Sequence, residues 1–150
     1  LEIKPHRNEV RDKRIADMCV ELVRTLGLEK KTEYISFSKV VCQRLHEITP
    51  NSKVAYLNGE LAPAQIKEMG LTGIDYYEKV FVKHPEWLQE AKQLGVEVNV
   101  WTVDGEENLR HHVNLEGVDL ITTNDPEILK GILAEQEAAK QPASKKSKKK

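Results

Sequence analysis

Two charged residues near the start of the chain, Glu2 and Lys4, have the types and the spacing to hold a metal ion and a phosphate group. They alternate with the apolar residues Leu1 and Ile3, so in a strand both charges lie on one face. A buried carboxylate or ammonium is costly unless it has a partner or a ligand. A divalent cation on Glu2 and an anionic substrate group beside Lys4 would satisfy both charges. A solvated edge strand is the alternative that this pattern leaves open.

Trp101 is a further candidate for a site. It ends the run VEVNVW, residues 96–101, in which valines alternate with polar residues as in a strand. The flat apolar face of a tryptophan suits the wall of a pocket for a carbon-rich part of a substrate. A core tryptophan at the rim of a barrel is the alternative.

These residues belong to a chain in which short strand patterns alternate with amphipathic helix patterns. Pro63, Pro85 and Pro126 stand where helices begin, and Gly27, Gly70 and Gly95 where they end. The strands are expected at 1–4, 33–37, 53–57, 73–77, 96–101 and 117–122, with the run at 73–77 the weaker one. The helices are expected at 8–26, 38–49, 63–70, 84–95, 106–115 and 125–140.

The first of these helices carries an apolar stripe that is expected to face the core. The stripe consists of Ile15, Met18, Cys19, Leu22, Val23 and Leu26. Cys19 and Cys42 are too few for a disulfide framework, so we expect two buried free thiols.

The alternation of strands and helices predicts the α/β class with a parallel sheet. An open doubly wound sheet and a (β/α)8 TIM-type barrel both fit this class. An open sheet that binds a nucleotide would carry a Gly-rich turn after an early strand, and none is present. We therefore expect about six βα units of a barrel whose first two units are missing. In such a barrel the site lies at the carboxyl ends of the strands, where Glu2, Lys4 and Trp101 fall.

Composition limits the class of protein further. Hydrophobic residues make up 39% of the 150 residues and charged residues 31%, as in soluble globular proteins, and no apolar run is long enough to form a transmembrane segment. Residues 140–150 hold six lysines and no acid, which leaves 17 basic against 24 acidic groups in the rest. We expect one folded domain over 1–139 and a disordered Lys-rich tail over 140–150, with no nucleic-acid partner for the acidic body.

Four motifs give the chain a resemblance to a known family. LEIK at 1–4, YISF at 34–37, VNVWTVD at 98–104 and GVDLITTNDP at 117–126 occur in this order. In order and spacing they resemble the second part of a glycerophosphodiester phosphodiesterase, from Leu1 to about Ala134. The resemblance implies a (β/α)8 barrel that hydrolyses glycerophosphodiesters to glycerol 3-phosphate and an alcohol with a divalent metal, calcium or magnesium. It also implies that Glu2 binds the metal, that Lys4 neutralises the phosphate, and that Phe37 and Trp101 line the glycerol-binding pocket.

The chain also departs from the family pattern. The histidine pair that serves the family as general acid and base is expected upstream, so no catalytic residue is assigned within this chain. We interpret His6 and Arg7 as a loop coincidence, and His46, His84, His111 and His112 as surface residues. Asp104 stands where the family commonly has asparagine, and Asn124 where it has aspartate.

The expected partner is therefore a small-molecule glycerophosphodiester, and the open edges of an incomplete barrel favour homo-oligomers. We expect the chain alone to be inactive and its natural N-terminus to lie upstream, which leaves both a periplasmic or secreted and a cytoplasmic location open. A non-catalytic barrel paralogue or binding module, an open-sheet protein with another phosphorylated ligand, and a related phospholipid phosphodiesterase are the alternatives.

Overall fold

A single parallel sheet forms the centre of the computed structural model, which describes residues 1–6 and 8–140. Its strands follow the order of the sequence: β1 (Tyr34–Ser36), β2 (Val54–Tyr56), β3 (Gly73–Tyr77), β4 (Glu97–Trp101) and β5 (Leu120–Ile121). The first residues of the chain extend the sheet beyond β1, because Glu2 forms a parallel bridge with Ile35. The Ile3 amide donates to the Ile35 carbonyl at 3.0 Å, and the Ile35 amide donates to the Leu1 carbonyl at 3.1 Å. This confirms the expected strand position of residues 1–3.

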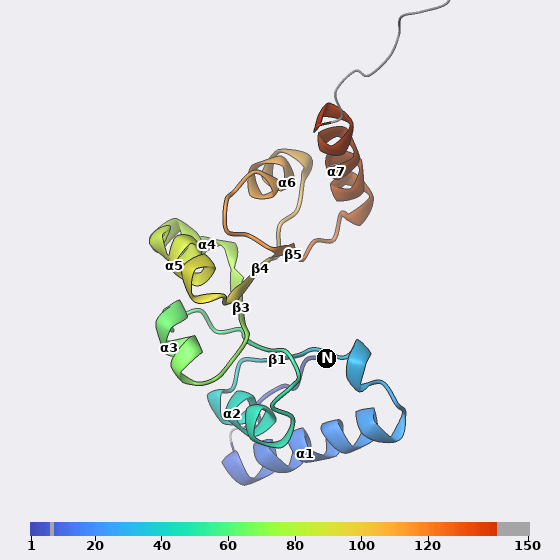
Figure 1. Cartoon of the computed structure of the whole chain (residues 1–150), viewed down its shortest axis with the longest axis vertical. Coiled ribbons are helices and arrows are strands. Elements are labelled where there is room, and N and C mark those ends of the chain that lie inside the picture. The colour runs from blue at the N-terminus through green and yellow to red at the C-terminus, as the bar shows by residue number, and fades with distance from the viewer. Residues whose placement is uncertain (7, 141–150) are drawn as a thin grey trace, which may run out of the picture.

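The helices lie around the outer side of the curved sheet, and the opposite side is open (Figure 1). They are α1 (Glu9–Thr25), α2 (Lys39–Ile48), α3 (Pro63–Glu68), α4 (Glu78–Lys83), α5 (Glu86–Leu94), α6 (Glu106–Val113) and α7 (Pro126–Lys140), with a 3₁₀ turn at Glu29–Lys31. An open doubly wound sheet would reverse its strand order and carry helices on both faces. The uninterrupted order and the single helical layer instead confirm the predicted barrel-type α/β arrangement.

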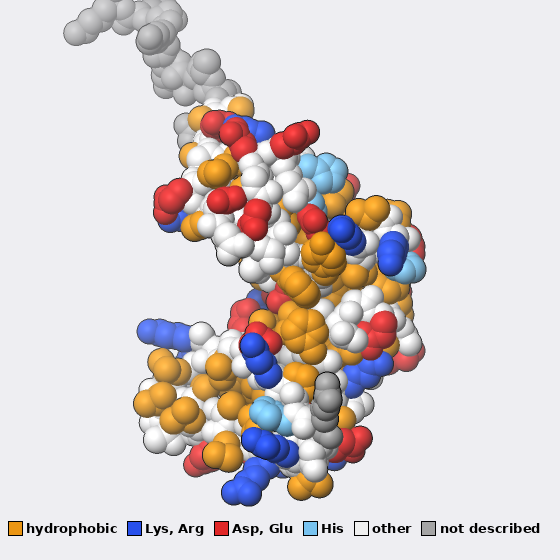
Figure 2. Space-filling view, turned by 180° about the vertical axis from the view of Figure 1, so that it is seen from behind, with side chains coloured by type: hydrophobic (Ala, Val, Ile, Leu, Met, Phe, Trp, Pro, Cys, Tyr) orange, Lys and Arg blue, Asp and Glu red, His pale blue; other side chains and the backbone are white. Residues whose placement is uncertain are grey.

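The core fills the space between the sheet and the helices. Ile74 and Tyr76 of β3 are fully buried on this outer face, beside Val98 and Val100 of β4. Because side chains alternate along a strand, the residues between them face the hollow inner side of the sheet. Figure 2 shows this hollow from behind, between the part around α6 and α7 and the part around α1 and α2.

Local capping explains where several helices begin and end. The Asn8 side chain accepts a hydrogen bond from the Arg11 amide at 3.0 Å and starts α1. Ser38, the residue expected to open the next helix, caps α2 in the same way through the Val41 amide at 3.3 Å. Gly95 ends α5 with a φ of 65°, a conformation that residues with a Cβ rarely adopt.

Two elements differ from the sequence-based prediction. The run at 73–77, expected to be the weaker strand, is a central strand whose five residues all pair with β4. Tertiary pairing on both edges compensates for its low apolar content. The helix expected at 84–95 is α5, which begins only at Glu86, and the unpredicted short helix α4 directly follows β3.

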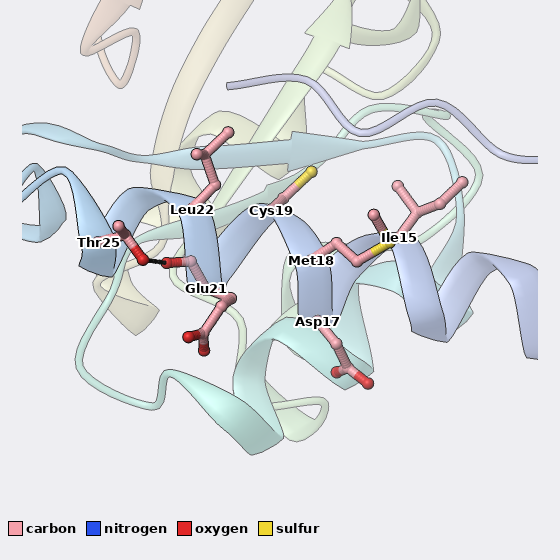
Figure 3. A pocket seen from close by; sticks show the side chains of 7 residues that line it. All are labelled: Ile15, Asp17, Met18, Cys19, Glu21, Leu22 and Thr25. Carbon is pink, nitrogen blue, oxygen red and sulfur yellow. Dashed lines mark hydrogen bonds between the residues drawn. The ribbon is translucent and has the colours of Figure 1, made fainter.

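The predicted core stripe of the first helix was wrong in part. The buried residues of α1 are Asp12, Ala16, Val20 and Val23, whereas Met18 is 60% exposed and Leu22 and Leu26 are each 59% exposed. These exposed side chains belong to the side of α1 that no described element covers, because α2 packs on the helix from its other side. A groove of about 770 Å³ follows this surface between Ile15 and Thr25 (Figure 3).

The two cysteines are free thiols, as expected, but only Cys42 is buried. Burial raises the pKa of the Cys42 thiol to about 12, which makes it unreactive at neutral pH. Cys19 is half-buried and lines the groove on α1.

The C-terminal part of the prediction falls mostly beyond the described chain. Helix α7 continues to Lys140, and the rest of the expected tail, 141–150, lies outside the described residues. Within the described ranges, none of the helices combines the length and the apolar character required to cross a lipid bilayer.

Candidate functional site

Glu2 and Lys4 flank Ile3 at the sheet edge formed by the first residues. Ile3 between them is 2% exposed and packs into the core on the outer face. The alternation of side chains along a strand therefore directs Glu2, which forms the bridge with Ile35, to the hollow face, and it predicts the same direction for Lys4. Leu1, the other apolar residue of this alternation, is 55% exposed, because it stands at the end of the edge strand.

The aromatic residues predicted for the pocket come together at the carboxyl ends of their strands. The rings of Phe37, directly after β1, and Trp101, at the end of β4, meet edge to face with centroids 6.0 Å apart. Tyr77 at the end of β3 lies on the other side of Trp101, with centroids 5.5 Å apart. The Lys79 ammonium stands 5.7 Å from the centroid of the Tyr77 ring. Three strands thus supply one aromatic wall with a cation beside it.

Asp75 of β3 is a buried carboxylate that the sequence analysis did not single out. It is 5% exposed, and its Oδ1 has no hydrogen-bond partner among the described residues. Burial raises the pKa of the Asp75 carboxyl to about 6, and the negative charge of Glu2 adds to this rise. The side chain of Asn99, in register with Asp75 on β4, opposes part of this rise in pKa. Its Nδ2 donates a hydrogen bond of 3.0 Å to the Thr122 hydroxyl. Glu2 is therefore close enough in space for its charge to act on the Asp75 carboxyl.

The indole of Trp101 is tied to the same strand position. Its Nε1 donates a hydrogen bond of 2.7 Å to the backbone carbonyl of Asp75. This bond fixes the ring relative to the Asp75 carboxylate, so the aromatic wall and the buried charge form one rigid unit.

A polar cluster follows β4 and β5 at the same end of the sheet. Asp104 accepts hydrogen bonds from the Asn124 amide at 2.8 Å and from the Asn124 Nδ2 at 2.9 Å. These bonds, and one from the Thr123 hydroxyl, hold the pKa of the Asp104 carboxyl below its usual value. Asp104 and Asn124 are the two positions at which the sequence departs from the family pattern, and they contact each other.

The histidines lie at the helices rather than in the aromatic wall. His6 approaches Asp12 of α1, with 3.8 Å between Nδ1 and Oδ1. His84 stacks on Trp87 of α5 with ring centroids 4.2 Å apart. The expectation of a surface position was wrong for His112, which is 7% exposed and has its Nδ1 2.9 Å from the Asn108 carbonyl oxygen. Arg7, the other half of the HR pair, lies outside the described residues.

Part of a site for a hard divalent cation fits these residues. Glu2 offers carboxylate oxygens of the kind that calcium and magnesium prefer, on the face where a barrel places its site. In residues 1–6 and 8–140, however, no three His, Cys, Asp or Glu side chains are grouped so that they could hold a metal ion. The described residues therefore fit one side of a metal site and not a full set of ligands.

Comparison with known proteins identifies the family. The model of the glycerophosphoryl diester phosphodiesterase family matches residues 1–128. The chain belongs to this family. A search of curated proteins gave no match.

Solved structures of family members have the same fold. A glycerophosphodiester phosphodiesterase from Parabacteroides distasonis superposes with a TM-score of 0.88 at 41% identity, over 91% of this chain and 57% of the other. A putative glycerophosphoryl diester phosphodiesterase from Silicibacter pomeroyi gives a TM-score of 0.80 at 24% identity, over 91% of this chain and 50% of the other. The chain thus spans between 50% and 57% of the length of these relatives, and its curved sheet corresponds to part of their barrel.

A more distant structure, at 14% identity, shares the fold with a TM-score of 0.71. It is a phosphodiesterase from Oleispira antarctica in complex with the product sn-glycerol-3-phosphate, and the match covers 89% of this chain and 55% of the other.

Sequence reasoning placed Glu2, Lys4, Phe37 and Trp101 at this site but missed Asp75 and Tyr77. A signal for both is present in GIDYY, where Gly73, Asp75 and Tyr77 alternate with the buried Ile74 and Tyr76. An acidic residue in the middle of a central parallel strand is costly unless it serves a ligand or a partner.

Proposed function

We propose that this chain forms the larger part of a metal-dependent phosphodiesterase that hydrolyses glycerophosphodiesters to glycerol 3-phosphate and an alcohol. The observation that carries the proposal is the contact of Phe37 with Trp101 at the carboxyl ends of their strands, in a chain of this family whose sheet is extended by the segment that contains Glu2 and Lys4. The glycerol-3-phosphate complex of the distant Oleispira antarctica relative supports the same class of product.

Each residue has a role that follows from its chemistry. Glu2 holds calcium or magnesium, which when bound would withdraw charge from the phosphoryl oxygens. Lys4 places an ammonium beside the phosphate and stabilises the charge that develops there. Phe37 and Trp101 cover the carbon part of the glycerol and exclude water from it, since their rings meet at 6.0 Å.

The residues present also define what the chain does not supply. No histidine of the described residues joins the aromatic wall, and Glu2 provides one metal ligand of an incomplete set. We therefore propose that the 150-residue chain is inactive alone and that a histidine pair and further acidic ligands come from two additional βα units. A non-catalytic barrel paralogue or binding module is the second candidate, favoured by the same lack of a complete metal cluster.

Self-association is the second property that we propose. The exposed apolar groove on α1 and the uncovered edge at residues 1–3 both belong to the end of the sheet that begins with β1. An uncovered strand edge beside an apolar helix face favours pairing between copies of the chain.

Hydrolysis of glycerophosphocholine, measured as release of glycerol 3-phosphate, tests the catalytic proposal. The chain alone is expected to show no hydrolysis above background, since acid and base catalysis typically contribute a factor of about 10² to 10⁴. A longer form that carries two upstream βα units is expected to be active with magnesium or calcium and inactive with EDTA.

Substitutions in that longer form test the assigned roles. Glu2→Gln is expected to abolish the metal-dependent activity, and Lys4→Met to reduce kcat/KM by at least about a hundredfold. Lys67→Met on the outer helix α3 is the matched control and should leave the activity unchanged. Hydrolysis that persists in Glu2→Gln or in EDTA would contradict the proposal, and an inactive longer form would favour the non-catalytic paralogue.

A further inference from the structure

We propose that Asp75 is a substrate-binding residue whose free carboxylate oxygen accepts a hydrogen bond from a hydroxyl group of the glycerol part of the substrate. The inference rests on the proposed function and deepens it, because it names the group that distinguishes a glycerophosphodiester from other phosphodiesters. Asp75 would thereby determine specificity for the glycerol end.

The first observation is an unsatisfied acceptor in the interior. Asp75 is 5% exposed, and its Oδ1 has no hydrogen-bond partner within the described part of the chain. It is the one buried side-chain oxygen or nitrogen of the described residues in this condition. Natural structures rarely leave such an atom unpaired, and a ligand that donates a hydrogen bond there removes the cost.

The second observation is the position of this oxygen within the site. Asp75 lies on the hollow face of β3, two residues before Tyr77 and in register with Asn99. The charge of Glu2 reaches it, and the indole Nε1 of Trp101 donates a hydrogen bond to its backbone carbonyl. Asp75 is therefore in contact with the aromatic wall and within reach of the charge of the proposed metal ligand, and we place the carbon chain of glycerol beside it.

The chemistry of the group selects a hydroxyl as its ligand. A carboxylate next to a second carboxylate repels a phosphate oxygen, so Asp75 is unsuited to the phosphate that Lys4 serves. A hydroxyl needs a single acceptor and adds no charge, which suits the fully buried, unpaired Oδ1.

The arrangement is also selective for a polyol. An analogue without the hydroxyl would leave the buried carboxylate unpaired. Such an analogue would therefore bind much more weakly than the substrate. Substrates in which the hydroxyl next to the phosphate ester is absent would leave Oδ1 unsatisfied again. Asp75 thus favours the binding of a glycerol group over that of a simple alkyl group at the same position.

Ligand titration of the full chain tests this inference with two probes in the presence of magnesium. The probes are sn-glycerol 3-phosphate and inorganic phosphate, followed by NMR chemical shifts so that weak binding is measurable. The wild-type chain is expected to prefer glycerol 3-phosphate. Asp75→Asn is expected to bind glycerol 3-phosphate about tenfold more weakly, the effect of replacing a charged acceptor by a neutral one, and to bind phosphate within about threefold of the wild type.

Thermal unfolding of the same variant separates a binding role from a structural one. A buried charge kept for a ligand costs stability in the free protein, so the neutral Asp75→Asn should raise the Tm at pH 7. Asp119→Asn is the matched control, because Asp119 accepts a hydrogen bond from the Val98 amide at 2.9 Å and is thus already partnered. The control should keep the preference for glycerol 3-phosphate and should not raise the Tm.

The outcomes distinguish this inference from the proposed function. If Asp75→Asn keeps the preference for glycerol 3-phosphate or lowers the Tm, or if the wild type binds both probes equally, the Asp75 inference is overturned. If the wild type binds neither probe, the Asp75 inference is overturned, whereas the proposed function is tested separately by hydrolysis in the longer form.

Discussion

Two aspartates of this chain have the same burial and opposite surroundings. Asp12 on α1 and Asp75 on β3 are each 5% exposed. Asp12 accepts a hydrogen bond of 2.8 Å from the His6 amide and one of 3.3 Å from the Ser38 hydroxyl. Asp75 leaves one oxygen without a partner in the described structure.

Burial alone therefore does not distinguish a structural carboxylate from one that binds a ligand. Asp12 joins the edge strand, the start of α1 and the cap of α2, so its charge stabilises a junction of the outer layer. Asp75 stands on the inner face of the sheet, where no helix covers it and a substrate would lie. A satisfied buried carboxylate is evidence for a structural role, and an unsatisfied one on a hollow face points to a ligand.

The largest expected effect is the loss of the satisfied carboxylate. Asp12→Ala removes both acceptors and leaves the His6 amide and the Ser38 hydroxyl without their partner. We expect the free energy of unfolding to fall by about 2 to 3 kcal/mol, as measured by urea denaturation at pH 7. A loss below about 0.5 kcal/mol would show that Asp12 lacks the structural role that distinguishes it from Asp75.

The substitution Asp75→Asn should instead increase the free energy of unfolding, and the increase should depend on pH. The pKa of Asp75 is raised from 3.8 to about 6 in the folded chain by burial, with the charge of Glu2 as a further cause. The folded state then binds a proton that the unfolded state has lost, so the wild type loses stability as pH rises from about 4 to about 6. Asp75→Asn should therefore be more stable by about 1 to 2 kcal/mol at pH 7, and by nearly nothing below pH 4.

Urea denaturation of both proteins in EDTA, at a series of pH values, measures this difference. Asp12→Asn serves as the control, because the same change at a partnered carboxylate should give no gain at pH 7. A constant difference across the pH range would show that the Asp75 carboxylate is not the cause.

A smaller effect is expected where two departures from the family pattern meet. Asp104 accepts two hydrogen bonds from Asn124, with the acid and the amide in exchanged positions relative to the family. Asp104→Asn should cost about 1 kcal/mol, and Asn124→Asp should bring two carboxylates together at a similar cost. The double variant restores an acid and an amide and should recover most of the loss in a double-mutant cycle of unfolding free energies. Additive losses would show that the two exchanges are independent.

The smallest effect on folding is expected on the uncovered face of α1. Met18→Lys and Leu22→Glu change side chains that are 60% and 59% exposed, so the free energy of unfolding should change by less than about 0.5 kcal/mol. If this face pairs copies of the chain, the same changes should reduce the apparent mass in light scattering. The control Val10→Lys alters a residue that is 79% exposed and outside the groove. A monodisperse wild-type monomer would contradict the proposed self-association.

The helices and strands could be predicted from the sequence more completely than the residues of the site. Period-two alternation in VEVNVW and the proline and glycine signals placed β4 and the starts of α3 and α7 within a residue or two. Phe37 and Trp101 came from motif resemblance, and the structure brings their rings together. Asp75 was missed because a strand with an acid and two tyrosines looks weak until its neighbours on both sides are known.

The order of strands and helices, the alternation of charged and apolar residues along the strands, and the family could all be predicted from the sequence alone. These properties depend on local periodicity and on short motifs, which are complete within a few residues. The tertiary structure decided which face of α1 is buried, that His112 is enclosed, and that one oxygen of Asp75 lacks a partner. Such properties depend on atoms from segments distant in the chain, because burial and hydrogen bonding are settled only when those segments meet.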